Sequence, residues 1–287
     1  MLVSAMMVCM ASTCSAPDNP VNDDEVPPHI TPPEEEVEVP VTIKKGEGVT
    51  RLVSYNVGAF NKYSNAIDMI AKMMKELDAD IVGLNEVDSC TTRTGRVHQA
   101  KKLAEKLGNW HYALATLHPY KEGLYGNAIV MSPEFKMEGK KKIQLPREST
   151  SDEIRSCAVI KNDKFVYMAT HLEVKRESAR LSGAKTITEW AKENYGSSDK
   201  PVFLCGDMNC EPNDAPIKEL LKDWTLLSVT ENTYPSRTSK KCIDYIFVLK
   251  NKAQYELVGS AVPLNFQYGS VEEASDHLPI YVDVKLK

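Results

Sequence analysis

The chain of 287 residues lacks an excess of basic residues. It has 35 Lys and Arg against 40 Asp and Glu, for a formal net charge of −5. Residues 15–45 hold eight acids and two lysines, a balance of −6, and residues 1–14 carry no charge, so 46–287 sum to +1. A nearly neutral folded part gives no sign of a long nucleic acid or another polyanion as partner.

Three other features are missing. No internal repeat is evident. The first fourteen residues are apolar, but too few to span a bilayer. Of seven cysteines, the five beyond residue 14 have spacings that match no zinc knuckle, and they leave one or two disulfides open: Cys90, Cys157, Cys205, Cys210 and Cys242. A repeat protein, a zinc ribbon and a protein anchored by this segment as a membrane span are therefore not indicated.

The N-terminal region is typical of an exported protein. Residues 1–14 resemble the apolar part of a secretory signal without its basic start. Ala11–Cys14 resembles a bacterial lipoprotein cleavage box, which would leave a lipid on Cys14; plain secretion is the alternative. Residues 15–48 are acidic and rich in proline, and we expect an extended tether that does not fold.

From residue 49 to 287 the pattern predicts one domain that is rich in strands. Apolar runs predict strands near 52–57, 81–84, 110–116, 126–131, 156–160, 164–170, 201–205, 243–248 and 278–284. Helical spacing of apolar residues predicts helices over 67–77, 100–107 and 181–191. Many strands with few helices between them favour stacked sheets with outer helices over a βα barrel.

Polar side chains stand at the ends of several predicted strands. Each alone has a simple reading as a turn residue, a solvated acid or a structural histidine. Five such clusters together indicate a site built from distant segments, which are Asn56, Glu86, His171, Asp207 with Asn209, and Asp276 with His277. A carboxylate next to an imidazole suggests hydrolytic chemistry.

The same segments resemble the endonuclease/exonuclease/phosphatase superfamily of metal-dependent phosphoesterases. The matching stretches are SYNVG (54–58), LNEVD (84–88), YGNAIVMS (125–132), EIRSCAVI (153–160), THLE (170–173), GDMNCEP (206–212), CIDYIFV (242–248) and SDHLPI (275–280). The resemblance implies an α/β fold, a four-layer sandwich of two packed mixed β-sheets flanked by helices. It also implies a Mg²⁺-dependent hydrolase that cleaves a phosphate ester by in-line attack of water.

The resemblance assigns a role to each matching residue. Glu86 would be the principal ligand of Mg²⁺, or of Mn²⁺ as the alternative, with Asn56 and Asp276 beside it. Five residues would take part in catalysis: Asp207 at the attacking water, Asn209 beside it, His277 and His171 on the phosphoryl group, and Asp244 orienting His277. Arg93 and Asn127 are the candidates for substrate binding, and Arg155 is expected to support the site from the sheet.

The substrate stays open at this stage. Gly58 and His171 depart from the branch of the superfamily that cleaves DNA at apurinic sites, and THLE is closer to secreted sphingomyelinases, deoxyribonucleases and inositol-phosphate phosphatases. The substrate could be a small molecule, a lipid head group or a nucleic acid. The alternatives are an exported nuclease and an inactive surface-binding domain. We expect a monomer in the bacterial cell envelope, lipid-anchored or periplasmic, or a secreted one.

Overall fold

The computed structural model describes residues 44–287. The predicted signal and lipidation at Cys14 lie outside the described residues, as does the tether up to residue 43. Lys45 Nζ donates hydrogen bonds of 2.9 and 2.8 Å to the two carboxylate oxygens of Asp80, so residue 45, four residues before the predicted start of the domain, already contacts it. Among the helices of residues 44–287, none is long and apolar enough to cross a membrane.

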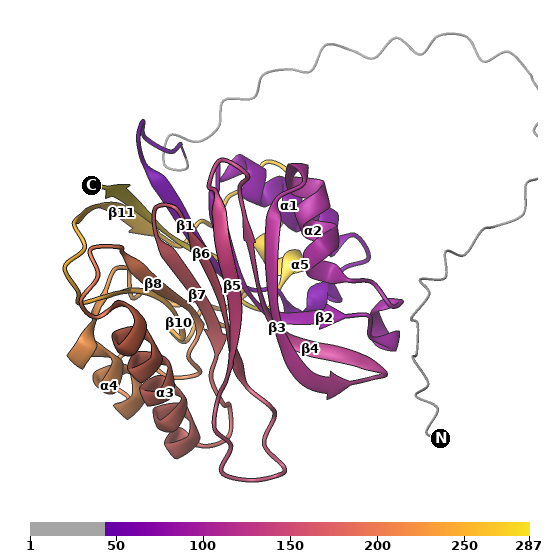
Figure 1. Cartoon of the computed structure of the whole chain (residues 1–287). Coiled ribbons are helices and arrows are strands. Elements are labelled where there is room, and N and C mark those ends of the chain that lie inside the picture. The colour runs from indigo at the N-terminus through magenta and orange to yellow at the C-terminus, as the bar shows by residue number, and fades with distance from the viewer. Residues whose placement is uncertain (1–43) are drawn as a thin grey trace, which may run out of the picture. The chain divides into compact units, whose positions relative to one another are not determined.

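Two mixed sheets of six strands form the centre of the fold (Figure 1). The first has the order β11-β12-β1-β2-β4-β3, with β11 Tyr255–Ala261, β12 Ile280–Leu286, β1 Thr50–Asn56, β2 Ile81–Ser89, β4 Gly123–Met131 and β3 His111–Tyr120. The second has the order β5-β6-β7-β8-β10-β9, with β5 Met137–Gln144, β6 Ser156–Asn162, β7 Val166–His171, β8 Val202–Asp207, β10 Asp244–Leu249 and β9 Trp224–Leu226.

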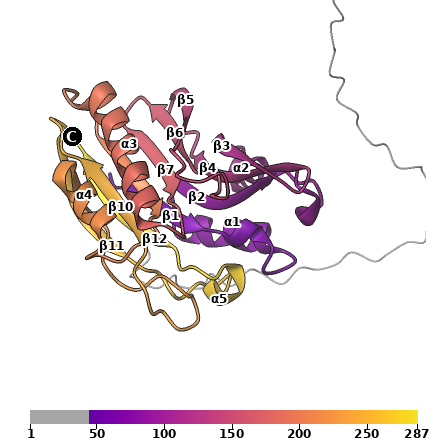
Figure 2. The same cartoon turned by 90° about the horizontal axis from the view of Figure 1, so that it is seen from below.

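Helices cover the outer faces of both sheets (Figure 2). α1 (Ala66–Glu76) and α2 (Gln99–Gly108) pack on the first sheet, and α3 (Glu177–Tyr195) and α4 (Ala215–Asp223) on the second. A short α5 (Val271–Ala274) lies beside α1. The predicted four-layer α/β sandwich is therefore confirmed.

Alternation along the strands explains why the layers stack. In β8, Phe203 and Cys205 belong to the core between the sheets, whereas Val202 and Leu204 pack under α3. β7 and β10 follow the same period of two. Successive side chains of a strand point to opposite faces, so strands that are apolar on both faces can be covered on both sides.

The strand directions gather the polar residues at one edge of the sandwich. β1 and β2 are parallel, as are β7 and β8, so each pair ends on the same side. β12 and β10 run antiparallel to their neighbours and begin at that edge, where Ile280 is opposite Ser54 and Asp244 is opposite Asp207. The segment before β12 therefore meets the end of β1.

Several elements were not predicted. β5 carries three consecutive lysines at an edge of the second sheet, and β11 is an exposed edge of the first. Both lack the apolar pattern because little of either strand is buried. β9, α4 and α5 were also missed. The five cysteines of the described chain are free, and four of them are buried.

Candidate active site

A cavity of about 460 Å³ opens at the edge where these strands end. It is lined by Glu86, Tyr125, Glu153, Arg155, His171, Val174, Asp207, Asn209, Tyr234, Lys241, Ile243, Asp276 and His277. Six of these were predicted from the sequence. Two further predicted residues, Asn56 and Asp244, are buried directly behind them and hydrogen bond to lining residues.

A buried histidine links two carboxylates at the base of the cavity. His277 Nδ1 lies 2.9 Å from Asp244 Oδ2, and its Nε2 lies 3.6 Å from Asp207 Oδ2. Thr233 Oγ1 donates a 2.6 Å hydrogen bond to the same oxygen of Asp244. Burial opposes the charge on His277, but Asp244, followed by Asp207, raises the pKa of this imidazole to about 10. His277 is therefore an imidazolium at neutral pH in the metal-free protein.

Asp207 interacts with polar residues from several elements of the site. Burial raises the pKa of its carboxyl group to about 7, although His277 favours the ionised form. Oδ1 accepts a 2.8 Å hydrogen bond from the amide of Asn209, and Oδ2 accepts one of 3.1 Å from Asn56 Nδ2. Asp207 therefore has one oxygen held by the turn that follows it and one that faces the other polar side chains.

The residue before Asp207 has to be glycine. Gly206 has φ +141°, and a Cβ placed there would lie 1.8 Å from the carbonyl oxygen of Thr170. Any side chain would collide with the backbone of β7. The Gly-Asp step of the GDMN motif thus reflects the close approach of β7 and β8.

Glu86, Asn56 and Asp276 supply further oxygen atoms. Glu86 has φ +58° and lies where the pairing of β2 with β4 shifts register, so a bulge directs its side chain into the cavity. Asn56 Nδ2 is 3.3 Å from Glu86 Oε1. Asp276 also lies near the end of β1. A Cβ placed on Gly58, two residues after Asn56, would be 3.4 Å from Asp276 Oδ1.

His171 and Asn209 form the opposite side of the base. His171 Nε2 lies 2.8 Å from Asn209 Nδ2 and 3.3 Å from Asp207 Oδ2. Burial, and then the positive charge of Arg155, lower the pKa of His171 well below its ordinary value. His171 is therefore a neutral imidazole, whereas His277 is charged.

Asn127 does not line the cavity, although the sequence marks it as a substrate-binding candidate. It is buried, and its Oδ1 accepts a 2.9 Å hydrogen bond from Asn85 Nδ2, while its Nδ2 donates one of 2.7 Å to the carbonyl of Ser156. Asn85 Oδ1 in turn accepts the amide of Asp207 at 2.9 Å. Asn127 thus connects the two sheets behind Asp207.

Arg93 also lies away from this cavity. Its Nε and Nη2 donate hydrogen bonds of 2.7 and 2.8 Å to the two oxygens of buried Asp88. Its guanidinium stacks over the rings of Tyr120 at 4.5 Å and Tyr125 at 5.3 Å. Nε and Nη2 are bound to Asp88, so Arg93 does not line this cavity; it borders a separate cavity beside α1 and α2.

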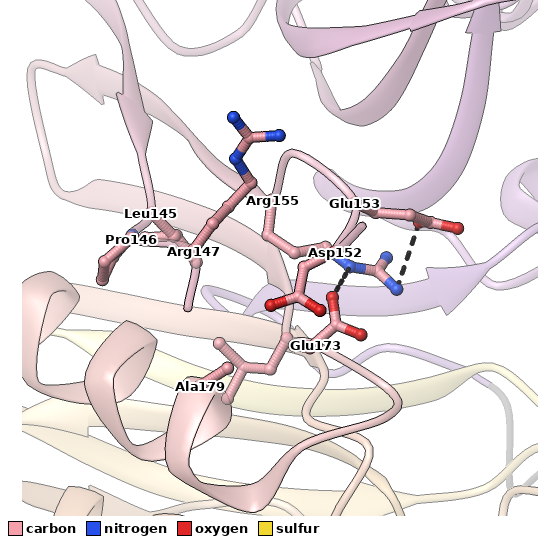
Figure 3. A pocket seen from close by; sticks show the side chains of 9 residues that line it. Leu145, Pro146, Arg147, Asp152, Glu153, Arg155, Glu173 and Ala179 are labelled. Carbon is pink, nitrogen blue, oxygen red and sulfur yellow. Dashed lines mark ion pairs between the residues drawn. The ribbon is translucent and has the colours of Figure 1, made fainter. Parts of the chain in front are cut away.

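Arg155 and its neighbours were not predicted to line the cavity. Figure 3 shows the guanidinium group of Arg155 between the carboxylates of Glu153 and Glu173, with N–O distances of 3.2 and 3.7 Å. The motif EIRSCAVI contains both Glu153 and Arg155, so the sequence held a signal for this part of the site. Tyr125 begins the motif YGNAIVMS in β4, so it too had a signal. Tyr234 and Lys241 carried none, because single aromatic and basic residues in loops are common.

Comparison with known proteins identifies the family. The family model described as the Endonuclease/Exonuclease/phosphatase family matches residues 53–277. The chain belongs to this family, as the sequence motifs indicated, and thus to the phosphoric ester hydrolases. No curated protein sequence matches the chain.

Solved structures of the family share the fold at low sequence identity. An endonuclease/exonuclease/phosphatase from Bacteroides vulgatus is 19% identical with a TM-score of 0.67, over 83% of this chain and 99% of that one. A mannosyl-6-phosphatase from Bacteroides thetaiotaomicron is 20% identical with a TM-score of 0.61, over 82% and 99%. The human Nocturnin catalytic domain, solved with a sulfate anion, is 16% identical with a TM-score of 0.65, over 85% and 97%.

The family is generally metal-dependent, and the site has an acidic and histidine cluster. Ligand atoms of Asp207, Asp244 and His277 lie within 4.8 Å of one another. In this cluster, however, His277 stands between the two carboxylates and interacts with both. The oxygen atoms of Glu86 and Asp276 on the cavity surface are the more accessible set.

Proposed function

We propose that the protein is a Mg²⁺-dependent hydrolase of phosphate esters. The observation that carries this proposal is the convergence on Asp207. Its Oδ2 lies 3.1 Å from Asn56, 3.3 Å from His171 and 3.6 Å from His277, at the base of one open cavity. The three partners come from β1, from β7 and from the segment before β12, so this arrangement depends on the whole sandwich.

The donor set fits a hard divalent cation. Among the described residues, the cavity is lined by four carboxylates (Glu86, Glu153, Asp207 and Asp276) and by two permanent cations, Arg155 and Lys241. A phosphate ester would add further negative charge. Glu86, Asp276 and Asn56 would hold the ion, since Mg²⁺ prefers oxygen ligands and keeps several waters. When bound, the ion supplies Lewis-acid neutralisation of charge on the phosphoryl group.

The chain's own residues would activate water and bind the phosphoryl group. Asp207 is placed to accept a proton from the attacking water, and Asn209 holds its other oxygen. Water attacks phosphorus as its proton passes to Asp207, the ester P–O bond breaks, and the leaving alkoxide takes up a proton from the solvent to give the alcohol. His277, held by Asp244, and neutral His171 contact the phosphoryl oxygens and stabilise the charge that develops there.

A small ester suits the cavity better than a long nucleic acid. Within residues 44–287, Lys241 and Arg155 are the only permanent cations that line it, and the folded part is nearly neutral. Nucleic acid affinity arises largely from basic residues that neutralise phosphates. One structural neighbour is a mannosyl-6-phosphatase, which fits a small phosphomonoester. A nuclease would instead show a steep dependence of affinity on salt concentration.

A substrate panel with Mg²⁺ and with EDTA tests the proposal. The panel contains para-nitrophenyl phosphate, its bis ester, sugar phosphates, phosphoinositides, sphingomyelin, RNA and plasmid DNA. We expect Mg²⁺-dependent turnover of at least one ester, and a loss of about 10²- to 10⁴-fold in kcat for Asp207→Asn. Glu189→Gln, an exposed acid on α3, serves as the control with unchanged activity. Turnover that survives EDTA or Asp207→Asn would overturn the proposal, as would a complete lack of turnover.

The predicted export is a separate proposal. An apolar start followed by an acidic, proline-rich stretch supports a signal and a tether, with a lipid on Cys14. Metabolic labelling with palmitate should mark the wild type and not Cys14→Ala. Absence of label in an exported wild-type protein would show plain secretion.

A further inference from the structure

Arg155 is a buried cation on one wall of the active-site cavity. Its side chain is only 9% exposed, and its Nε–H has no hydrogen-bond partner among the described residues. This Nε faces Oε2 of Glu173 at 3.7 Å as an ion pair, and both atoms are buried. The rest of the guanidinium group, beside Glu153, is therefore the part of Arg155 that a ligand in the cavity can meet.

The wall lies within reach of the alcohol part of a bound ester. Arg155 directly precedes β6, which pairs with β7, and β7 ends at His171 in the phosphoryl site. One strand spacing of about 5 Å therefore separates the two. Lys241 precedes β10, three strand spacings or about 14 Å from β6, at the other side of the cavity. Arg155 and Lys241 thus face different parts of a ligand.

The charge of the wall disfavours a second anionic group. Arg155 is flanked by Glu153 and Glu173, so the three side chains together carry −1. Nearby Asp152 is paired with Arg176 and adds no net charge. An anion that approached the guanidinium would also approach two carboxylates. A hydroxyl group meets no such penalty, because it donates to a carboxylate and accepts from a guanidinium.

The remaining features of the wall suit a compact polar ring. Tyr125 lines the same cavity as Glu86, Glu153 and Arg155, so its phenol is available to a ligand that contacts this wall. Arg93 holds the ring in place from outside the cavity. The second cavity that Arg155 borders measures only about 10 Å³, room for one water, so a ligand has to bind on the Tyr125 side.

We propose that Arg155 and Glu153 select the substrate by hydrogen bonding to hydroxyl groups of an uncharged alcohol, so that the substrate class is a sugar phosphate. The inference rests on the proposed function, and it adds two residues that determine specificity. A site built to hydrogen bond a substrate hydroxyl rejects an analogue that lacks it, because its own polar groups then lose their partners. The two carboxylates beside Arg155 reject a second phosphate by repulsion.

The test compares selectivity ratios for matched substrates. Fructose 6-phosphate and fructose 1,6-bisphosphate differ in one anionic group, and hexose 6-phosphates differ from para-nitrophenyl phosphate in their hydroxyl groups. We expect the wild type to have a kcat/KM at least tenfold higher for the best hexose monophosphate than for either the bisphosphate or para-nitrophenyl phosphate. Arg155→Lys should lower the ratio of the hexose phosphate to para-nitrophenyl phosphate at least tenfold, since it loses the guanidinium fork.

Glu153→Gln gives a second test that does not depend on a buried residue. Its side chain is 41% exposed, so the variant should fold even if Arg155→Lys does not. It should raise the ratio of bisphosphate to monophosphate at least fivefold. Glu148→Gln, an exposed acid of the same loop that does not line the cavity, should change both ratios less than twofold.

The outcomes separate the two proposals. If no phosphate ester is hydrolysed with Mg²⁺, the proposed function fails. If para-nitrophenyl phosphate or its bis ester is hydrolysed but hexose monophosphates are not preferred, the sugar-phosphate inference is overturned. A wild-type preference for the bisphosphate, or equal ratios in wild type and Glu153→Gln, would also overturn it.

Discussion

Gly83 of β2 and Cys205 of β8 meet across the two sheets. A Cβ on Gly83 would lie 2.2 Å from Cys205 Sγ and 3.0 Å from the Cβ of Ala169. The contact lies three residues before Glu86 and two before Asp207, directly beneath the cavity. The distance between the sheets at this point therefore sets the distance between Glu86 and Asp207.

Gly83→Ala should destabilise the protein by about 1–3 kcal/mol, because the added methyl group forces the sheets apart. Combining it with Cys205→Ala should recover part of that loss, since the sulfur is the closest atom. Urea unfolding of the two single variants and the double variant measures the coupling. Effects that add within about 0.5 kcal/mol would show that the two positions do not interact.

Asn127→Ala should lower the free energy of unfolding by about 1–3 kcal/mol, because Asn85 and Ser156 lose buried hydrogen bonds. It should also lower kcat, since Asn85 holds the backbone of Asp207. Asn194→Ala, which removes an exposed amide on α3, should change stability by no more than about 0.5 kcal/mol. Normal stability with a raised KM would instead favour direct substrate binding by Asn127.

The stability of the metal-free protein should depend on pH through His277. Burial opposes its protonation, but Asp244 raises the folded-state pKa to about 10, above the ordinary value of 6.5. The stabilising contribution is therefore fully present below pH 6.5 and is lost as the pH rises through about 10. In EDTA-treated protein, NMR titration should show a charged His277 at pH 8, and Asp244→Asn should lower its pKa. A neutral ring at pH 7 in the wild type would contradict this prediction.

Mg²⁺ should stabilise the folded protein, and removal by EDTA should reverse the effect. At a concentration one hundred times Kd, binding to the native state alone adds about 2.7 kcal/mol. Glu86→Gln should abolish this gain in thermal unfolding, whereas Glu189→Gln should retain it. An equal Mg²⁺-induced shift in Tm for Glu86→Gln and the wild type would exclude Glu86 as a ligand.

Much of the fold could be predicted because most strands are covered on both faces. Runs such as Val202–Cys205 and Tyr245–Val248 are apolar throughout, which marks buried strands even without alternation. The helical spacing of apolar residues also predicted the helices α1, α2 and α3. β5 and β11 were not predictable in this way. Edge strands bury little surface, and three lysines in β5 keep that edge soluble at the expense of any apolar signal.

The site could be predicted as far as short motifs reach. Glu86, Asp207 and His277 each stand in a motif beside a buried strand, and the structure brings them to one cavity. Asn127 also stands in a motif, yet it is buried behind the cavity, and Arg93, the other candidate for substrate binding, is bound to Asp88 outside it. A motif marks a residue as a candidate for the site. Only the packing of the two sheets shows whether its side chain faces the cavity or another side chain. Arg155 is the opposite case. We expected it to support the site from the sheet, and the structure places it on the cavity wall beside Glu153 and Glu173.

Both ends of the described domain leave from the edge opposite the cavity. β1 runs from Thr50 to Asn56, a length of about 20 Å, and β12 returns beside it to finish next to Thr50. Lys45, bound to Asp80, marks the same end. A bead, surface or reporter protein joined at either end would thus leave the mouth of the catalytic cavity open to the surrounding solution.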